Sequence, residues 1–371
     1  MKTRQLGMWV TVAAVLVTAW AGAAQLITEA GKIEFYGPTM NSYGAGFSGT
    51  SGGYLAVADG LAHLVQTYDA NHQDRLEYRR WDPAAGMSGD WAGSVVRLGD
   101  IVTPSGSVGF INPFITVDGG DRVSIIYQER SDLTRTWYQR WCANASGSDP
   151  LNAANWSAPA ALGVPAGGPG SVATVSSDTI LLAQYRDGDS DGDSDITIEK
   201  GVWNGSGYTW TSLGVVLAGV PVGYDYGCLR APNITVAGGV LHMSLYSAER
   251  GGQRGIQYAQ SSDPLNPVAG TWSARELLIN PNPPAQVETN GGVGVTADGT
   301  PVALVWGAGN RDGGAPYANF QRVRGSGGWG AWQPAFVGDM RYMPTAYGAG
   351  SDWVAADFAS DGTPQDGLFA L

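Results

Sequence analysis

Ile234-Thr-Val-Ala-Gly238-Gly239-Val-Leu-His-Met-Ser-Leu-Tyr246 has a short apolar run on each side of a glycine pair, and the second run ends in an aromatic residue. A glycine pair between two such runs is typical of a tight turn between antiparallel strands. The same plan occurs six times, so the chain contains a repeat. The turn residues are Asp59-Gly60, Gly119-Gly120, Ser177-Asp178, Gly238-Gly239, Asp298-Gly299 and Gly350-Ser351.

The repeat has a nearly constant length. Successive turns are 60, 58, 61, 60 and 52 residues apart. In each repeat the strand after the turn ends in an aromatic residue at the same place, and we expect this position to serve packing. The aromatic residues are Tyr68, Tyr127, Tyr185, Tyr246, Trp306 and Phe358.

Two further strand-like runs follow in the repeats. The third runs include 76–81, 136–141 and 195–199, and a fourth run opens near a tryptophan, for example Trp156 or Trp210. Four short strands in a repeat of about 50–60 residues are the pattern of a propeller blade. The sequence therefore predicts an all-β protein, a six-bladed β-propeller.

The last repeat ends after its third run, whereas residues 26–36 form a strand-like run without a repeat of its own. We expect this N-terminal strand to supply the outer strand of the last blade. Such a strand would close the ring and leave no open sheet edge. Residues 25–371 would then form a single domain.

Residues 1–24 have the three parts of a secretory signal peptide. Lys2 and Arg4 precede an apolar run over residues 8–20 and then the small residues 21–24. We expect the protein to be exported, either secreted or periplasmic. No segment has the length that a membrane-spanning helix requires.

Charge and composition exclude some partners. The net charge of −12 becomes −14 without Lys2 and Arg4, which argues against nucleic acid as a partner. Arginine far outnumbers lysine, and its planar fork suits carboxylate or sulfate-like groups. We expect a monomer without an organic cofactor. The blade scheme places Cys142 and Cys228 on opposite faces, so we expect both thiols to be unpaired.

Charged residues gather in the predicted loops between second and third strands. In a propeller these loops and the links between blades emerge on one face, where ligands usually bind. We therefore predict that this face binds an anionic glycan or polysaccharide. Arg186 lies in one such loop, and the candidates for contacts with the ligand are His72, Asp74, Arg75, Glu249, Arg250 and Arg311. His63 and His242 hold matching places inside second strands, which favours a structural role for both.

Two motifs resemble the sialidase superfamily. Arg230-Ala231-Pro232 resembles its Arg-Ile-Pro motif, with Ala231 in place of Ile. The segments 148–152 and 262–266, both Ser-Asp-Pro-Leu-Asn ahead of a tryptophan, resemble the Asp-box without its glycine. The resemblance covers most of the chain as architecture but only these residues as motif.

This resemblance implies a glycoside hydrolase for a terminal acidic sugar. In that family arginines bind the substrate carboxylate, a tyrosine beside a glutamate is the nucleophile, and an aspartate is the acid and base. By motif, Arg230 would bind the carboxylate, and Glu249 would be the acidic partner. Several tyrosines and aspartates fit the other roles, and we select Tyr226 and Asp74. The full candidate set is Tyr224, Tyr226, Tyr246, Tyr342, Asp69, Asp74 and Asp312.

Two alternatives stay open. The protein could be a propeller that binds glycans without catalysis. It could instead be a lyase of uronic-acid polymers, in which His72 would act with Tyr68 and Arg75. A lectin usually repeats one pocket in most blades, whereas these loops differ from one another, which favours a single central site.

The acidic run after Arg186 matches the pattern Asp-x-Asp-x-Asp-Gly-x-x-Asp. Alternate carboxylates around a glycine can surround a hard cation with oxygen ligands, as Ca²⁺ requires. We predict a structural Ca²⁺ in this loop. Its ligands would be Asp187, Asp189, Asp191, Asp193 and Asp195.

Overall fold

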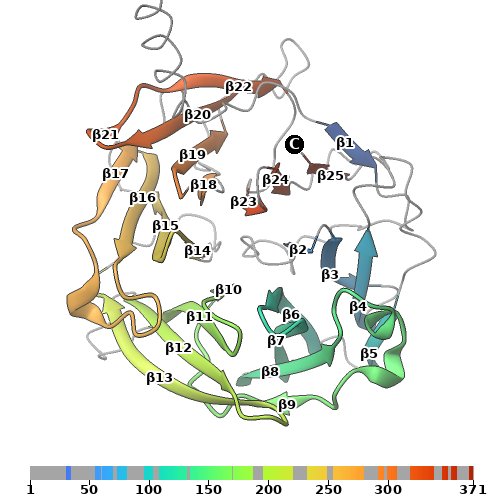
Figure 1. Cartoon of the computed structure of the whole chain (residues 1–371). Coiled ribbons are helices and arrows are strands. Elements are labelled where there is room, and N and C mark those ends of the chain that lie inside the picture. Colours follow the sequence, from blue (N-terminus) through green and yellow to red (C-terminus); the bar gives the residue numbers. More distant parts are fainter. Residues whose placement is uncertain are drawn as a thin grey trace, which may run out of the picture.

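The computed structural model consists of antiparallel β-sheets arranged around a common centre (Figure 1). It describes residues 31–34, 55–59, 61–69, 73–81, 96–102, 108–131, 134–168, 170–186, 195–219, 232–248, 254–279, 291–295, 299–306, 318–337, 345–349, 352–356 and 367–370. Within these ranges the only helices are short 3-10 turns, at Asp149–Leu151, Ala153–Asn155 and Ala269–Thr271. The protein is all-β, as the sequence predicts.

The strands form six sheets. The first strands are β2 (Leu55–Ala58), β6 (Val108–Asp118), β10 (Gly170–Thr174), β14 (Asn233–Ala237), β18 (Gly291–Val295) and β23 (Thr345–Ala349). The second strands are β3 (Leu61–Asp69), β7 (Arg122–Ser131), β11 (Thr179–Arg186), β15 (Val240–Ala248), β19 (Pro301–Trp306) and β24 (Asp352–Ala356). The third strands are β4 (Gln73–Trp81), β8 (Thr134–Ala143), β12 (Asp195–Trp203), β16 (Arg254–Ser261), β20 (Ala318–Gly325) and β25 (Gly367–Ala370).

The outer strands differ in length and origin. In the first four sheets they are β5 (Val96–Val102), β9 (Ala160–Ala161), β13 (Tyr208–Leu217) and β17 (Glu276–Ile279). The fifth sheet has two short pieces on β20, namely β21 (Gly328–Trp329) and β22 (Gln333–Val337). In the sixth sheet the outer strand is β1 (Gly31–Glu34), which pairs antiparallel with β25 from the other end of the chain.

The repeated turn residues lie between first and second strands. Asp59-Gly60 joins β2 to β3, and Gly238-Gly239 joins β14 to β15. Both Gly238 and Gly239 have left-handed backbone angles, φ 58° and 74°, which a residue with a side chain rarely adopts. The glycine pair is therefore the local reason why the chain reverses here.

The first strands line the centre of the arrangement in Figure 1, and each contacts the first strands of both neighbouring sheets. These contacts run from β2 through β6, β10, β14 and β18 to β23, and β23 also contacts β2.

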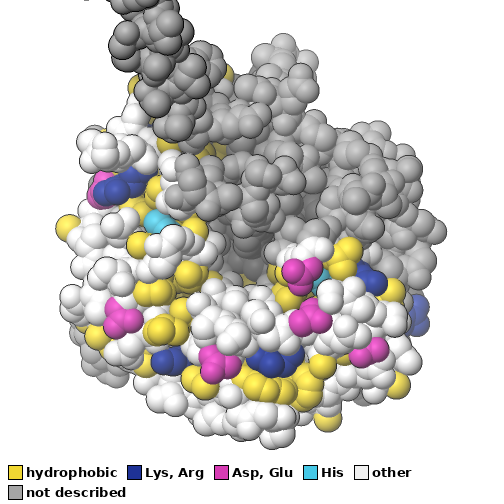
Figure 2. Space-filling view, in the orientation of Figure 1, with side chains coloured by type: hydrophobic (Ala, Val, Ile, Leu, Met, Phe, Trp, Pro, Cys, Tyr) yellow, Lys and Arg dark blue, Asp and Glu magenta, His cyan; other side chains and the backbone are white. Residues whose placement is uncertain are grey.

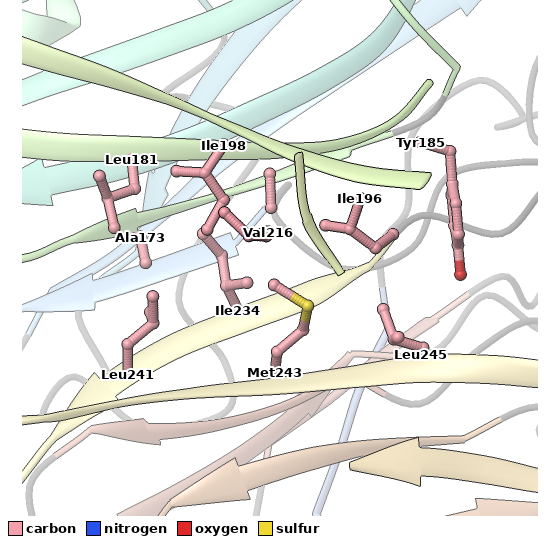
Figure 3. Packing of buried hydrophobic residues seen from close by; sticks show 11 residues of the cluster. Ala173, Leu181, Tyr185, Ile196, Ile198, Val216, Ile234, Leu241, Met243 and Leu245 are labelled. Atoms are coloured by element: carbon pink, nitrogen blue, oxygen red, sulfur yellow. The ribbon is translucent and has the colours of Figure 1, made fainter. Parts of the chain in front are cut away.

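Apolar cores lie between neighbouring sheets. Figure 3 shows the one between the third and fourth sheets, where Ile196 and Ile198 of β12 face Met243 and Leu245 of β15. A second core joins the second and third sheets, and a third joins the fourth and fifth. Tyr127 and Tyr185, two of the aromatic residues that end second strands, are buried. In these two repeats the aromatic residue therefore serves packing.

The two Asp-box-like segments follow the third strands β8 and β16. In each segment the tryptophan indole donates to a proline carbonyl of the same loop, Trp156 Nε1 to Pro150 O at 3.0 Å and Trp272 Nε1 to Pro267 O at 3.1 Å. These hydrogen bonds fold the loop onto its own tryptophan. The segments therefore act as local structural units in this chain.

Three buried residues have the structural roles expected of them. His63 Nδ1 is 2.8 Å from the Tyr78 hydroxyl, and His242 Nδ1 is 2.7 Å from the Tyr258 hydroxyl. Cys142 is a free, buried thiol, as predicted, and burial raises its pKa to about 11. Cys228 and residues 1–24 lie outside the described residues.

The described ranges contain no helix with the length and apolar character that crossing a bilayer would require.

Candidate functional site

The first strands of neighbouring sheets run in the same direction. A Cβ on Gly119 would lie 3.1 Å from the Cα of Ser177, and a Cβ on Gly238 would lie 3.7 Å from the Cα of Gly299. The turns between first and second strands are therefore adjacent from sheet to sheet. We call this side of the molecule the turn end.

The opposite side is called the loop end. Here the first strands begin, and the backbone N–H of Ile234 in β14 donates to the Ser171 hydroxyl of β10 at 3.1 Å. Because each second strand runs from the turn end to the loop end, the connections between second and third strands leave from the loop end. The sequence places its charged loops at these connections.

Three predicted site residues lie in the described ranges. Asp74 and Arg75 belong to strand β4 rather than to the loop before it, because they pair in register with Asp69 and Tyr68 of β3. Asp195 is the first residue of β12 and is fully buried. The others lie outside the described residues, namely His72, Asp187, Asp189, Asp191, Asp193, Tyr226, Arg230, Glu249, Arg250 and Arg311.

The best-defined polar group of the loop end surrounds Gln184 of β11, between the second and third sheets. Its Oε1 accepts from Trp137 Nε1 at 2.8 Å and from Gly167 N at 2.7 Å. Its Nε2 donates to Pro165 O at 2.9 Å and to Glu199 Oε1 at 3.0 Å. All four hydrogen-bonding positions of this buried amide are used, and the two N–H donors fix which way it faces.

The segment over Gln184 is the link between the second and third sheets, residues 162–168. Gly168 N donates to Tyr185 O at 2.6 Å, and Gln128 Nε2 donates to Gly167 O at 3.0 Å. A Cβ on Gly167 would lie 2.2 Å from Tyr185 O, which no side chain could tolerate without a shift. This link is therefore held closely against β11.

Glu199 and Thr197 follow the same face of β12. Both are buried, and both have an oxygen without a hydrogen-bond partner, Glu199 Oε2 and Thr197 Oγ1. A buried carboxylate with one free oxygen is costly in free energy. The buried Glu199 carboxylate therefore makes the interior polar at this position.

Asp195 and Arg186 form the last pair of the β11–β12 ladder at the loop end. Asp195 Oδ1 accepts from Gly219 N at 3.2 Å and so holds the chain that leaves β13. Arg186 is half-buried, and its Nε is enclosed without a hydrogen-bond partner. The pair therefore includes one acid with a structural hydrogen bond and one base whose Nε has none.

Glu129 of β7 is a half-buried acid near this end, and burial raises its pKa. It lies two residues beyond Tyr127, whose pKa is raised by burial first and by the charge of Glu129 second. A carboxyl with a raised pKa keeps its proton to a higher pH than an ordinary glutamate does.

In the view of Figure 2, acidic and basic side chains of the described residues are scattered over the described part of the ring and form no large patch of one sign on this face.

Sequence reasoning did not single out Gln184 or Glu199, and it counted Glu129 only as one of several charged residues in a ligand-face loop. A glutamine within an apolar strand and a glutamate in the middle of another carry no motif. The partners of Gln184 come from β8, from the link and from β12, which only the fold brings together. Arg186 was noted as a loop residue, but the structure places it at the end of β11.

No protein-family description and no curated protein matches the sequence. Among solved structures the chain is similar to a Hadza microbial sialidase, at 13% identity over 92% of this chain and 67% of that chain, with a TM-score of 0.54. This similarity shows a shared propeller-type fold.

Two other solved structures are similar at lower scores. One is an alpha-L-arabinofuranosidase from Lactobacillus brevis, at 13% identity over 82% of this chain and 98% of that chain, with a TM-score of 0.48. The other is an ulvan lyase of polysaccharide lyase family PL25, at 12% identity over 91% of this chain and 81% of that chain, with a TM-score of 0.46.

Proposed function

We propose that this protein is an exported, sialidase-like glycoside hydrolase that acts on a terminal acidic sugar of a glycan. One observation carries the proposal: connections between second and third strands leave from the loop end, and Glu249, Arg250 and Arg311 belong to these connections in the sequence. The fold shared with a sialidase supports it, although a fold by itself does not define an activity.

We further propose that the six sheets are the blades of one closed propeller. The chain of contacts among the first strands, from β2 to β23 and back to β2, supports this. So does the pairing of β1 with β25, which gives the sixth sheet its fourth strand. Closure would direct all loop-end connections toward one central site.

The proposed roles follow the sequence. Arg230, Arg250 and Arg311 bind the substrate carboxylate, because a partly dehydrated carboxylate needs several charge-assisted donors. Tyr226 is the nucleophile with Glu249 beside it. Asp74 is the acid and base. Arg75 and His72, next to it in the chain, contact the sugar.

The hydrogen bonds of Gln184 hold the link over residues 162–168 in place beside the proposed site. A link held by Gln184, Gln128 and Tyr185 cannot shift without breaking buried hydrogen bonds. Sites that are held rigidly bind and orient a substrate better than mobile ones. We also retain the proposal of a structural Ca²⁺ in the loop that ends at Asp195.

Arg230→Ala tests the proposal, with Arg97→Ala in β5 as a control because Arg97 is exposed. The parent should release a reducing acidic sugar from sialylated or uronate-containing glycans. We expect Arg230→Ala to reduce that release at least about 100-fold while the melting temperature stays within a few degrees, since it removes a charge-assisted contact.

The same assay separates the alternatives. An unsaturated, ultraviolet-absorbing product would identify a lyase instead. Binding without any product would identify a glycan-binding propeller. Equal activity of Arg230→Ala and the parent would refute the role given to Arg230.

A further inference from the structure

Arg186 differs from the other enclosed arginines because its guanidinium has no partner among the residues that the structure describes. Four described arginines have a buried Nε without a hydrogen bond, and they are Arg79, Arg186, Arg322 and Arg324. In three of these arginines another guanidinium nitrogen contacts a described residue. Arg79 approaches Glu77 at 3.7 Å, Arg324 approaches Glu276 at 2.9 Å, and Arg322 donates to Trp329 O at 3.2 Å.

No ion pair or hydrogen bond between described residues involves the Arg186 side chain. Its ladder partner Asp195 accepts a hydrogen bond from Gly219 N at 3.2 Å. A half-buried guanidinium whose enclosed Nε has no acceptor among the described residues is costly in free energy, because that donor has left water. Such a donor points to an anion that completes the site.

The position of Arg186 fits a ligand contact. It ends β11 at the loop end, two residues from Gln184 and so on the same face of the strand. Its Cβ would be 3.1 Å from a Cβ on Gly167, so it lies against the link that Gln184 holds. Packing against the link therefore fixes the Cβ of Arg186, and the pairing of β11 with β12 fixes its backbone.

We infer that Arg186 binds an oxyanion, the carboxylate or sulfate group of an acidic sugar, at the loop end of the third sheet. This inference rests on the proposed function for the identity of the ligand. Guanidinium groups bind either oxyanion through two parallel hydrogen bonds, and the enclosed Nε supplies one of them. The ligand's charge would also offset the cost of the half-buried cation.

The test compares the parent with Arg186→Gln and Arg186→Lys, and Arg97→Gln serves as the control for loss of one exposed arginine. The probes are N-acetylneuraminate, glucuronate, inorganic sulfate and, as a neutral sugar, glucose. Affinity is measured by calorimetry, and thermal melting checks the fold.

We expect Arg186→Gln to weaken binding of the acidic probes by about 10- to 100-fold, the loss of one charge-assisted hydrogen bond, and to leave any affinity for glucose unchanged. Arg186→Lys should retain part of the affinity, because it keeps the charge but not the fork. Preference for the two carboxylates over sulfate would identify a uronic or sialic acid, and the reverse a sulfated sugar.

Two results would overturn the inference. One is equal affinity of the parent and Arg186→Gln for every acidic probe. The other is a parent that binds none of the anions while Arg186→Gln alone lowers the melting temperature, because the acids that follow Arg186 in the chain would then be its partner. A parent that binds sulfate through Arg186 but processes no glycan would refute the proposed function and leave this site standing.

Discussion

At the scale of single residues, Gln184 shows how one side chain can organise three segments of the chain. It accepts from β8 and from the link over residues 162–168, and it donates to that link and to β12. No other side chain has its length, its two acceptor positions and its two donors.

We predict that Gln184→Leu lowers the free energy of unfolding by at least about 3 kcal/mol, because it leaves several buried groups without partners. Denaturant unfolding measures the change. Glu199→Gln is the matched control: it keeps the acceptor for Gln184 and removes a buried charge, so it should change stability by less than about 1 kcal/mol. A Gln184→Leu variant as stable as the parent would contradict the role of this network.

Residues of this kind explain the limit of prediction from sequence at the site. Charged residues in loops stand out in a sequence, and the predicted site residues came from that signal, from a motif or from the family resemblance. Gln184 does not stand out, since its role depends on partners distant in sequence. The register of β3 with β4 also decides that Asp74 and Arg75 are strand residues.

At the scale of elements, the first and fourth sheets repeat one device inside their second and third strands. His63 of β3 contacts Tyr78 of β4, and His242 of β15 contacts Tyr258 of β16. Burial lowers the pKa of His63 to about 4, with Arg80 adding to the effect and Asp121 opposing it. Burial also lowers the pKa of His242 to about 4, opposed by a backbone hydrogen bond and aided by Arg324.

These shifts predict how stability depends on pH. Because both pKa values are depressed on folding, the unfolded chain takes up protons first as pH falls below about 6.5. The contribution of the neutral, buried histidines to the free energy of unfolding is fully present above about pH 6.5. It is lost as the pH falls from about 6.5 to about 4, by up to about 3 kcal/mol for each histidine.

The measurement compares unfolding free energies of the parent and of a His63→Gln, His242→Gln double variant from pH 7 down to about pH 4. Glutamine can still bond to the tyrosine hydroxyls but does not titrate. The parent should lose more stability than the variant as the pH falls. Parallel curves would mean that the histidines are protonated alike in both states.

The acidic loop between β11 and β12 carries the prediction for calcium. If its aspartates close on Ca²⁺, added Ca²⁺ should raise the melting temperature and a chelator should lower it, since a ligand of the folded state stabilises that state. Asp189→Asn with Asp191→Asn should abolish the response. A melting curve unaffected by Ca²⁺ and chelator in the parent would rule out the site.

The strands themselves could be predicted from sequence more fully than the site. Turn residues such as Gly238-Gly239 are local signals, and their regular spacing marks sheet after sheet. The short outer strand β9 and the division of the fifth outer strand into β21 and β22 have no such signal, because outer strands follow the packing of the strands inside them.

At the scale of the whole molecule, β1 is the only strand in the described part that pairs across the two ends of the chain. We predict that a chain starting at residue 37 melts at a lower temperature, and less cooperatively, than one starting at residue 25. The reason is that β25 would then become an unpaired edge. Thermal unfolding by circular dichroism provides the comparison, and identical curves would argue against ring closure by β1.

The pairing of β1 with β25 also sets an order for folding. The first five sheets consist of strands that are consecutive in the chain, so each can assemble as soon as its own residues are available. The sixth cannot, since β1 is the first of the described strands to be synthesised and its partner β25 is the last. Among the described strand pairs this contact has the greatest sequence separation, so we expect its closure to be slow. A chain that stops before β25 therefore cannot complete the sixth sheet, because β1 then has no strand to pair with.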